Sequence, residues 1–211
     1  MIKIGLTGSI GSGKTTVLNL FKNYGFLTVN LDEEAKKIYK KNSLEYKKIV
    51  DFFGNKILNK DYDIDRGVLA GIIFSDISKK KVLEDIVYPA LRQKIDVFLA
   101  ENSESAAVIE GAVIIESGYY LNLDKTALVT CDFSKRVMRS YKKFDIEDFT
   151  KRDKNQLSQK EKIKKSDFII NNNFGFKFLI SQIEFFVQFL KNIYGDKLKS
   201  IPINMPVSNK L

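Results

Sequence analysis

The sequence predicts an α/β fold in which helices cover both faces of a parallel five-stranded sheet. Short apolar segments alternate with longer helical patterns along most of the 211 residues. This alternation is typical of parallel strands that are joined by helical crossovers. A glycine-rich segment at residues 8–13 separates the first apolar segment from the helical pattern that follows it. Such a segment between a strand and a helix indicates an anion-binding turn at the edge of the sheet.

The predicted strands are short apolar segments. The first surrounds Gly5, the second ends at Asn30, and the third is an apolar run that ends in Glu110. Their ranges are 2–6, 26–30, 106–110, 126–131 and 168–170. Because helical segments lie between them, we expect these strands to run parallel to one another.

The segments between the strands show helical periodicity. A helix is expected to begin near Thr16, and further helices are predicted at 33–41, 43–53, 66–74, 77–100, 134–142, 147–155 and 159–165. The segment 176–194 places apolar residues at alternating spacings of four and three, which predicts an amphipathic helix. Those residues are Leu179, Ile183, Phe186, Leu190 and Ile193. We expect the phenylalanines of this helix to pack in the core.

The elements group into one domain with two helical insertions. The core is expected at about 1–31, 101–133 and 161–195. The first insertion spans about 32–100, and the second, rich in lysine and arginine, spans about 134–160. Residues 196–211 contain two prolines and are expected to form a loose tail.

Composition excludes several classes of function. The chain has no histidine, so catalytic triads that use histidine and histidine metal sites are excluded. The single cysteine, Cys131, excludes an internal disulfide and suits a reducing cytoplasm. No apolar run is long enough to span a membrane. The net charge is +9, from 35 Lys and Arg against 26 Asp and Glu. The lysines are scattered in pairs along the sequence, and this distribution favours a solvated surface over a nucleic-acid interface.

Residues Gly8 to Thr15 fit the pattern G-x-x-x-x-G-K-[ST] of a loop that binds nucleoside triphosphate phosphates. Glycines permit the backbone that turns successive N–H groups toward one anion, and the next helix points its positive end there. We expect Lys14 to contact the β- and γ-phosphates of ATP and the Thr15 hydroxyl to bind Mg²⁺. The predicted ATP-binding residues of the loop are Gly8, Gly11, Ser12, Gly13, Lys14, Thr15 and Thr16.

The rest of the chain indicates a small-molecule kinase. A switch GTPase needs an Asn-Lys-x-Asp motif, and Asn59-Lys60 is followed by Asp61 and Tyr62, which does not fit. Asp32 follows the second predicted strand, and an acid at the carboxyl end of a strand faces the ligand crevice. There it can accept a proton from an attacking hydroxyl. The alternative is that Asp32 only caps the helix at 33–41.

In its ordered motifs the chain resembles the dephospho-CoA kinase family. The family typically reads GLTGGIGSGKS and then V-x-D-A-D-x-x-A, and this chain has GLTGSIGSGKT and VNLDEEA. The resemblance covers nearly all of residues 1–195. It continues through Phe53-Gly54, Ile64–Leu69, Ile73-Phe74, Leu83–Pro89, Val113–Gly118, Arg152-x-x-x-Gln156, and Lys162-x-x-x-x-Asp167-x-x-Ile170-x-Asn172-Asn173.

The resemblance implies an ATP-dependent kinase that phosphorylates the ribose 3′-hydroxyl of dephospho-CoA, the last step of coenzyme A synthesis. It implies that the first insertion binds the substrate and that the second is a lid. Asp32, Lys14 and Arg139 are then the expected catalytic residues, with Arg139 contacting the transferred phosphoryl group from the lid. Asn172 is expected on the adenine side, and the expected substrate contacts are Asp32, Phe53, Arg66 and Tyr88.

The chain departs from the family pattern at four places. Asn30 replaces the first acid of the D-x-D pair, and Tyr88 replaces the histidine of a His-Pro pair. A Pro-Leu-Leu segment is replaced by Ala112-Val113-Ile114, and Lys143 replaces a lid arginine. These departures concern the substrate and lid contacts and leave the phosphate loop intact.

Two alternative functions stay open on the sequence. Another small-molecule kinase, for a nucleoside or nucleotide, would share the phosphate loop and differ in its preferred acceptor. A non-catalytic, nucleotide-dependent RNA-binding module would show strongly salt-dependent RNA binding and no phosphorylated product. The preferred interpretation has ATP and dephospho-CoA as ligands, with no nucleic-acid or membrane partner, in a cytoplasmic monomer or weak homo-oligomer.

Overall fold

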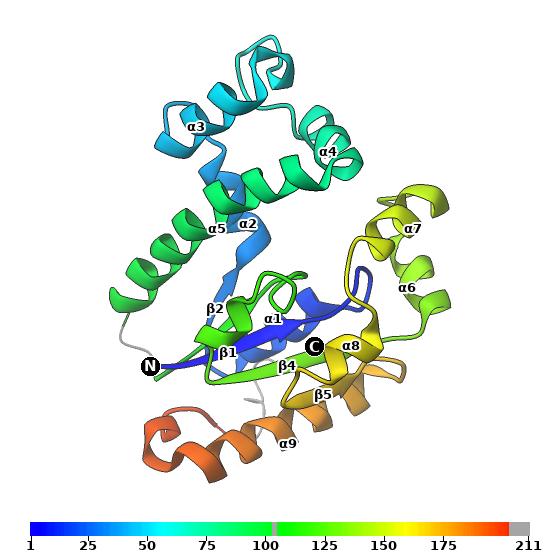
Figure 1. Cartoon of the computed structure of the whole chain (residues 1–211). Helices are drawn as coiled ribbons and strands as arrows, with labels where there is room; N and C mark the ends of the chain where they lie inside the picture. Colours follow the sequence, from blue (N-terminus) through cyan, green and yellow to red (C-terminus); the bar gives the residue numbers. More distant parts are fainter. Residues whose placement is uncertain (103–104, 203–211) are drawn as a thin grey trace. The chain divides into compact units, whose positions relative to one another are not determined.

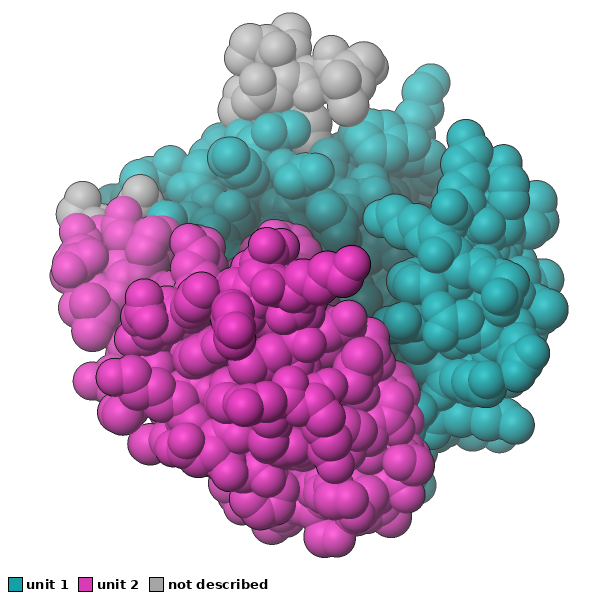
Figure 2. Space-filling model, turned by 90° about the horizontal axis from the view of Figure 1, so that it is seen from above, with its two compact units in different colours: residues 1–30, 103–211 teal, residues 31–102 magenta. Residues whose placement is uncertain are grey.

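The computed structural model describes residues 1–102 and 105–202. The chain forms two compact units, which Figure 2 colours separately. The core unit contains residues 1–30 together with the part of the chain from 103 onward, and the helical unit contains residues 31–102. The helical unit has nearly the bounds of the first expected insertion.

The core unit is built on a five-stranded sheet in the order β2-β3-β1-β4-β5 (Figure 1). The strands are β1 (Ile2–Thr7), β2 (Leu27–Asn30), β3 (Ala106–Glu110), β4 (Lys125–Thr130) and β5 (Phe168–Asn171). Every pairing is parallel, which confirms the predicted α/β fold. The central strand β1 pairs with β3 on one side and β4 on the other. Ligands of such sheets bind at this switch point, outside the carboxyl ends of the strands.

One face of the sheet is covered by α1 (Lys14–Asn23) and α9 (Phe176–Tyr194) (Figure 1). Alternate residues of β1, which are Ile2, Ile4 and Leu6, point into this apolar core. Phe21 and Phe186 meet edge to face in it, with ring centroids 5.9 Å apart. The phenylalanines of α9 are divided, since Phe186 is fully buried while Phe185 is exposed.

The expected loose tail is wrong for its first residues. A short 3₁₀ helix follows α9 at Gly195–Leu198. Leu198 and Ile201 are buried in the same apolar core as residues of α1 and α9, since burial removes their apolar side chains from water. The remainder of that expectation, residues 203–211, lies outside the described residues.

Three further helices of the core unit follow β4. They are α6 (Phe133–Ser140), α7 (Ile146–Lys154) and α8 (Gln159–Ile163). The hydroxyl of Ser158 and the carboxylate of Glu161 form a capping box at the start of α8. A 3₁₀ turn at Tyr119–Asn122 lies between β3 and β4. Helices α6 and α7 occupy the range expected for the lid.

The helical unit contains α2 (Leu31–Ile38), α3 (Leu44–Phe53), α4 (Arg66–Ser75), α5 (Ile77–Ala100) and a 3₁₀ turn at Asn55–Ile57. It has its own apolar core, which includes Ile49, Ile57 and Leu83. Side chains cap three of its helices: Ser43 caps α3, Asp65 caps α4 and Asp76 caps α5. Among the described residues of both units, no helix is long and apolar enough to cross a membrane.

Candidate active site

The glycines of the phosphate loop adopt conformations that the loop requires. Gly11 has φ 75° and Gly13 has φ 93°, which side chains of L-residues rarely adopt. A Cβ atom on Gly13 would lie 2.2 Å from Nδ2 of Asn172, and one on Gly11 would lie 2.5 Å from the carbonyl oxygen of Arg136. The loop therefore has neighbours packed directly against its backbone.

The N-terminus of α1 is left open by its cap residue. Gly13 provides no side-chain hydrogen bond to the first turn of α1. Side chains cap α3, α4, α5, α7 and α8, whereas α6 and α9 share with α1 the absence of a side-chain cap. The positive end of the α1 dipole at this loop favours an anion, and the cap residue supplies no acceptor of its own there.

The polar side chains of the loop differ in their exposure and in their contacts. Lys14 is half-buried, and its Nζ donates to the Ser9 carbonyl oxygen at 3.4 Å. The Ser12 hydroxyl is buried without a hydrogen-bond partner among the described residues. Thr15 and Thr16 are exposed in the first turn of α1. A buried hydroxyl without a partner costs free energy, which a phosphate oxygen would relieve.

Arg139 and Asn172 meet at the junction between the loop and α1. Nδ2 of Asn172 donates to the Ser12 carbonyl oxygen at 2.8 Å. The Arg139 guanidinium donates to the Asn172 carbonyl oxygen at 3.0 Å and to Sγ of Cys131 at 3.2 Å. It also reaches the Ser12 carbonyl oxygen at 3.5 Å. The structure therefore brings together the predicted residues from the loop, α6 and the end of β5.

Asp32 belongs to the helical unit and is exposed. Helix α2 begins at Leu31, so Asp32 lies inside its first turn. The alternative in which Asp32 is the residue before a helix at 33–41 is therefore wrong. Its carboxylate still interacts favourably with the α2 dipole, which is a structural role that needs no substrate.

Glu110 is a buried acid at the carboxyl end of β3 that sequence reasoning did not select. It is the last residue of β3 and only 2% exposed, and its Oε2 accepts from Nδ2 of Asn30 at 2.6 Å. Asn30 is the last residue of β2, in register with Glu110. Two carboxylates at this distance would repel, so the amide of Asn30 suits its neighbour. The rule that selected Asp32, an acid at the carboxyl end of a strand, also selects Glu110.

The predicted substrate contacts of the helical unit, Phe53, Arg66 and Tyr88, differ in how far their side chains are exposed. Phe53 is 4% exposed within the apolar core of that unit, so its ring has a packing role and little of it is accessible for the expected substrate contact. Arg66 is exposed, and its guanidinium lies 5.9 Å from the ring centroid of Tyr39. Burial raises the pKa of Tyr39. Tyr88 is half-buried and donates to Oε1 of Glu84 at 3.1 Å.

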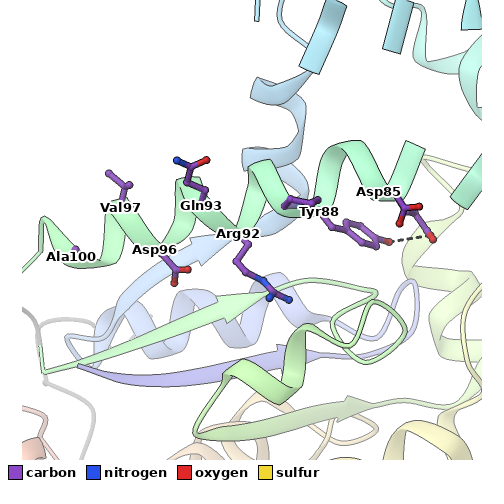
Figure 3. A pocket seen from close by; sticks show the side chains of 9 residues that line it. Asp85, Tyr88, Arg92, Gln93, Asp96, Val97 and Ala100 are labelled. Atoms are coloured by element: carbon purple, nitrogen blue, oxygen red, sulfur yellow. Dashed lines mark hydrogen bonds between the residues drawn. The ribbon is translucent and has the colours of Figure 1, made fainter. Parts of the chain in front are cut away.

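Tyr88 also lines a hollow along α5 (Figure 3). Arg92 and Asp96 project from one side of the helix, while Gln93 and Val97 project from the other. Arg92, which sequence reasoning did not select, adds a cation to this lining. A lining of this kind combines an aromatic ring with charged groups that can orient a polar ligand.

A buried ion pair fixes the loop after β3. Lys162 of α8 is fully buried, and its Nζ donates to the Ala112 carbonyl oxygen at 2.7 Å and to Oε1 of Glu116 at 2.9 Å. The same carboxylate oxygen accepts from the Leu157 backbone N–H at 2.9 Å. The family motifs contained Lys162 and Glu116, but nothing in their sequence separation indicated this contact.

Comparisons with known proteins match most of the chain to one family. A family model described as dephospho-CoA kinase matches residues 2–177. A dephospho-CoA kinase of Aquifex aeolicus is 35% identical over 175 residues, which are 82% of this chain and 89% of the relative. One of Fusobacterium nucleatum is 34% identical over 187 residues, 88% of this chain and 96% of the relative.

Two solved structures are similar in fold and sequence. A dephospho-CoA kinase of Campylobacter jejuni has a TM-score of 0.63 at 31% identity, covering 90% of this chain and 97% of that one. The protein TT1252 of Thermus thermophilus has a TM-score of 0.80 at 27% identity, covering 92% of this chain and 98% of that one.

Proposed function

The chain belongs to the dephospho-CoA kinase family of ATP-dependent kinases that catalyse the last step of coenzyme A synthesis, and on this premise we propose how its residues divide the reaction. The observation that carries the proposal is the phosphate loop, whose helix α1 begins without a side-chain cap. An anion of the size of a triphosphate satisfies the N–H groups there.

ATP binds with its phosphates against residues 8–16. Lys14 contacts the β- and γ-phosphates, and the buried Ser12 hydroxyl donates to a phosphate oxygen. Mg²⁺, when bound, neutralises phosphate charge, and Thr15 and Glu110 are the protein groups that would hold it. Hydroxyl and carboxylate oxygens are the ligands that this ion prefers. We propose that Asn172, whose Nδ2 donates to the Ser12 carbonyl oxygen, contacts ATP on the adenine side.

Dephospho-CoA binds to the helical unit, and Asp32 orients the ribose 3′-hydroxyl and accepts its proton as the phosphoryl group is transferred in line. Tyr88 and Arg66 contact the rest of the substrate. The position of Asp32 on the first turn of a helix, exposed to solvent, supports this role, because a general base must be accessible to the substrate.

The segment from α6 to α7 acts as the lid. Arg139 supplies positive charge to the transferred phosphoryl group, and closure excludes water that would otherwise be phosphorylated. The contact of Arg139 with the Ser12 carbonyl oxygen supports this proposal, because Ser12 lies within the phosphate loop.

A substrate panel tests the proposal. Initial rates of ADP formation are measured with dephospho-CoA, nucleosides, nucleoside monophosphates and pantothenate as acceptors. We expect dephospho-CoA to be preferred by a wide margin. Equal or faster turnover of a nucleoside monophosphate would favour the alternative small-molecule kinase.

Two features of the protein outside the reaction are also proposals. A cytoplasmic location follows from the need for ATP and a soluble biosynthetic substrate. A monomer or weak homo-oligomer is the expected assembly, and sedimentation at micromolar concentration measures it.

Salt-dependent RNA binding without kinase activity would favour the RNA-binding alternative over the kinase function.

A further inference from the structure

The backbone of Ile10, at the tip of the phosphate loop, is held from both sides by the lid segment. Its N–H donates to Oε1 of Gln156 at 3.1 Å. Its carbonyl oxygen accepts from Arg136 at 3.2 Å. Arg136 belongs to α6, and Gln156 lies just after α7. Both peptide groups that flank Ile10 are thereby fixed by residues more than a hundred positions away in the sequence.

Arg136 is held rigidly in this position. It is only 7% exposed, and its two terminal nitrogens contact the two carboxylate oxygens of Asp153 at 2.6 and 3.3 Å. The guanidinium also lies 5.4 Å from the ring centroid of Phe133 and 5.8 Å from that of Phe149. A planar guanidinium that is paired in this bidentate way has little freedom, so it presents a fixed donor to Ile10.

Close packing strengthens the connection. A Cβ on Gly11 would lie 2.5 Å from the Arg136 carbonyl oxygen and 2.7 Å from the Ser140 hydroxyl. Helix α6 therefore lies directly against the loop at the residue next to Ile10. The shape of the loop tip depends on α6 and on the residues that hold it.

We propose that Arg136, Asp153 and Gln156 are positioning residues that preorganise the phosphate loop for ATP through the backbone of Ile10. The loop binds phosphate with N–H groups that must all face one anion, and a mobile tip has to be ordered when ATP binds. Fixing the tip beforehand removes that cost, so it strengthens ATP binding without contacting the acceptor. This inference rests on the proposed binding of ATP at residues 8–16.

Two variants distinguish preorganisation of the phosphate loop from a role that only stabilises the lid segment. Gln156→Leu removes the acceptor for Ile10 and leaves the Arg136–Asp153 pair intact. Asp153→Asn weakens that pair and leaves both contacts to Ile10 possible. Steady-state kinetics are measured with each substrate varied in turn, and thermal midpoints are measured without ligand. Glu147→Gln, which removes an exposed ion pair with Lys151 on the same helix α7, is the matched control.

We expect Gln156→Leu to raise KM for ATP about five- to tenfold, which is the effect of one lost hydrogen bond, while KM for dephospho-CoA changes less than twofold. Asp153→Asn should raise KM for ATP less and lower the thermal midpoint more, and Glu147→Gln should match the wild type. Arg136→Lys, which keeps one charge but loses the bidentate geometry, should also raise KM for ATP.

The proposal is overturned if KM for ATP stays within twofold of the wild type in both Gln156→Leu and Arg136→Lys. It is also overturned if only the thermal midpoints change. Absence of kinase activity in the wild type would instead contradict the proposed function, so the two failures are distinguishable.

Discussion

Replacement of Lys162 by methionine should destabilise the core unit strongly. Methionine approximates the length of the lysine side chain but removes the ammonium group, which is fully buried between Glu116 and the Ala112 carbonyl oxygen. The Glu116 carboxylate, which is 18% exposed, then keeps only the Leu157 N–H as a donor. Removing one partner of a buried pair costs about 3–5 kcal/mol, because the remaining charge is left uncompensated.

Differential scanning calorimetry measures this loss. For a chain of this size each kcal/mol lowers the thermal midpoint by about 2–4 °C, so we expect a decrease of about 6–20 °C. Lys125→Met is the matched control, since Lys125 also pairs with an acid, Asp167 at 3.0 Å, but both side chains are partly exposed. Surface pairs contribute about 0–1 kcal/mol, so the control should lose at most a few degrees.

A double variant tests the cause of the loss. Lys162→Met combined with Glu116→Gln removes the unpaired charge and keeps an acceptor for the Leu157 N–H. We expect it to recover at least half of the lost stability, because replacing both charges is far cheaper than removing one. The reasoning is refuted if Lys162→Met lowers the midpoint no more than Lys125→Met does.

Three further substitutions test the active site. Lys14→Ala should abolish most activity in a kinase assay while the ligand-free thermal midpoint stays within about 5 °C, and unfolding of the variant would reveal a structural role. Asp32→Asn should lower kcat by about 10² to 10⁴ with KM for ATP nearly unchanged, whereas a variant that keeps more than about a third of kcat would show that Asp32 is not the base. Gly13→Ala should cost about 1–3 kcal/mol of stability and weaken ATP binding in calorimetric titration, because φ at Gly13 is 93° and the new Cβ would displace the Asn172 side chain. Gly71→Ala, inside helix α4 and with open space around the Cβ, is its control and should be neutral or slightly stabilising.

Local sequence patterns predicted the fold well because the apolar spacing and the glycine positions of each element determine its local structure. The apolar spacing of Leu179, Ile183 and Phe186 gives α9, whose bounds are Phe176–Tyr194. The glycine pattern predicted a loop that opens directly onto α1, and the structure has Gly13 at that cap position. Periodicity failed at the tail, where the short apolar residues Leu198 and Ile201 reach the core without a regular pattern.

Contacts between distant segments could not be predicted from local patterns. Gln156 and Arg136 reach Ile10 across sequence separations of 146 and 126 residues, and no periodicity encodes such a pairing. The same holds for Lys162 and Glu116, whose burial depends on how α8 packs. Glu110 differs from these, because strand order alone places its carboxylate next to Asn30. The rule that an acid at the carboxyl end of a strand faces the ligand crevice applies to Glu110 as well as to Asp32.

The junction between β2 and α2 has a consequence for how this chain can change in evolution. Strand β2 ends at Asn30 and helix α2 begins at Leu31, so no linker separates the sheet from the helix that carries Asp32. One inserted or deleted residue at this point would rotate Asp32 by about 100° around the helix axis, since an α-helix has about 3.6 residues per turn. By contrast, residues Asn59–Asp63, in the segment between α3 and α4, are all exposed. A change in the length of this segment should therefore be tolerated. We therefore expect natural length variation to be tolerated in that segment and to be excluded between residues 30 and 32.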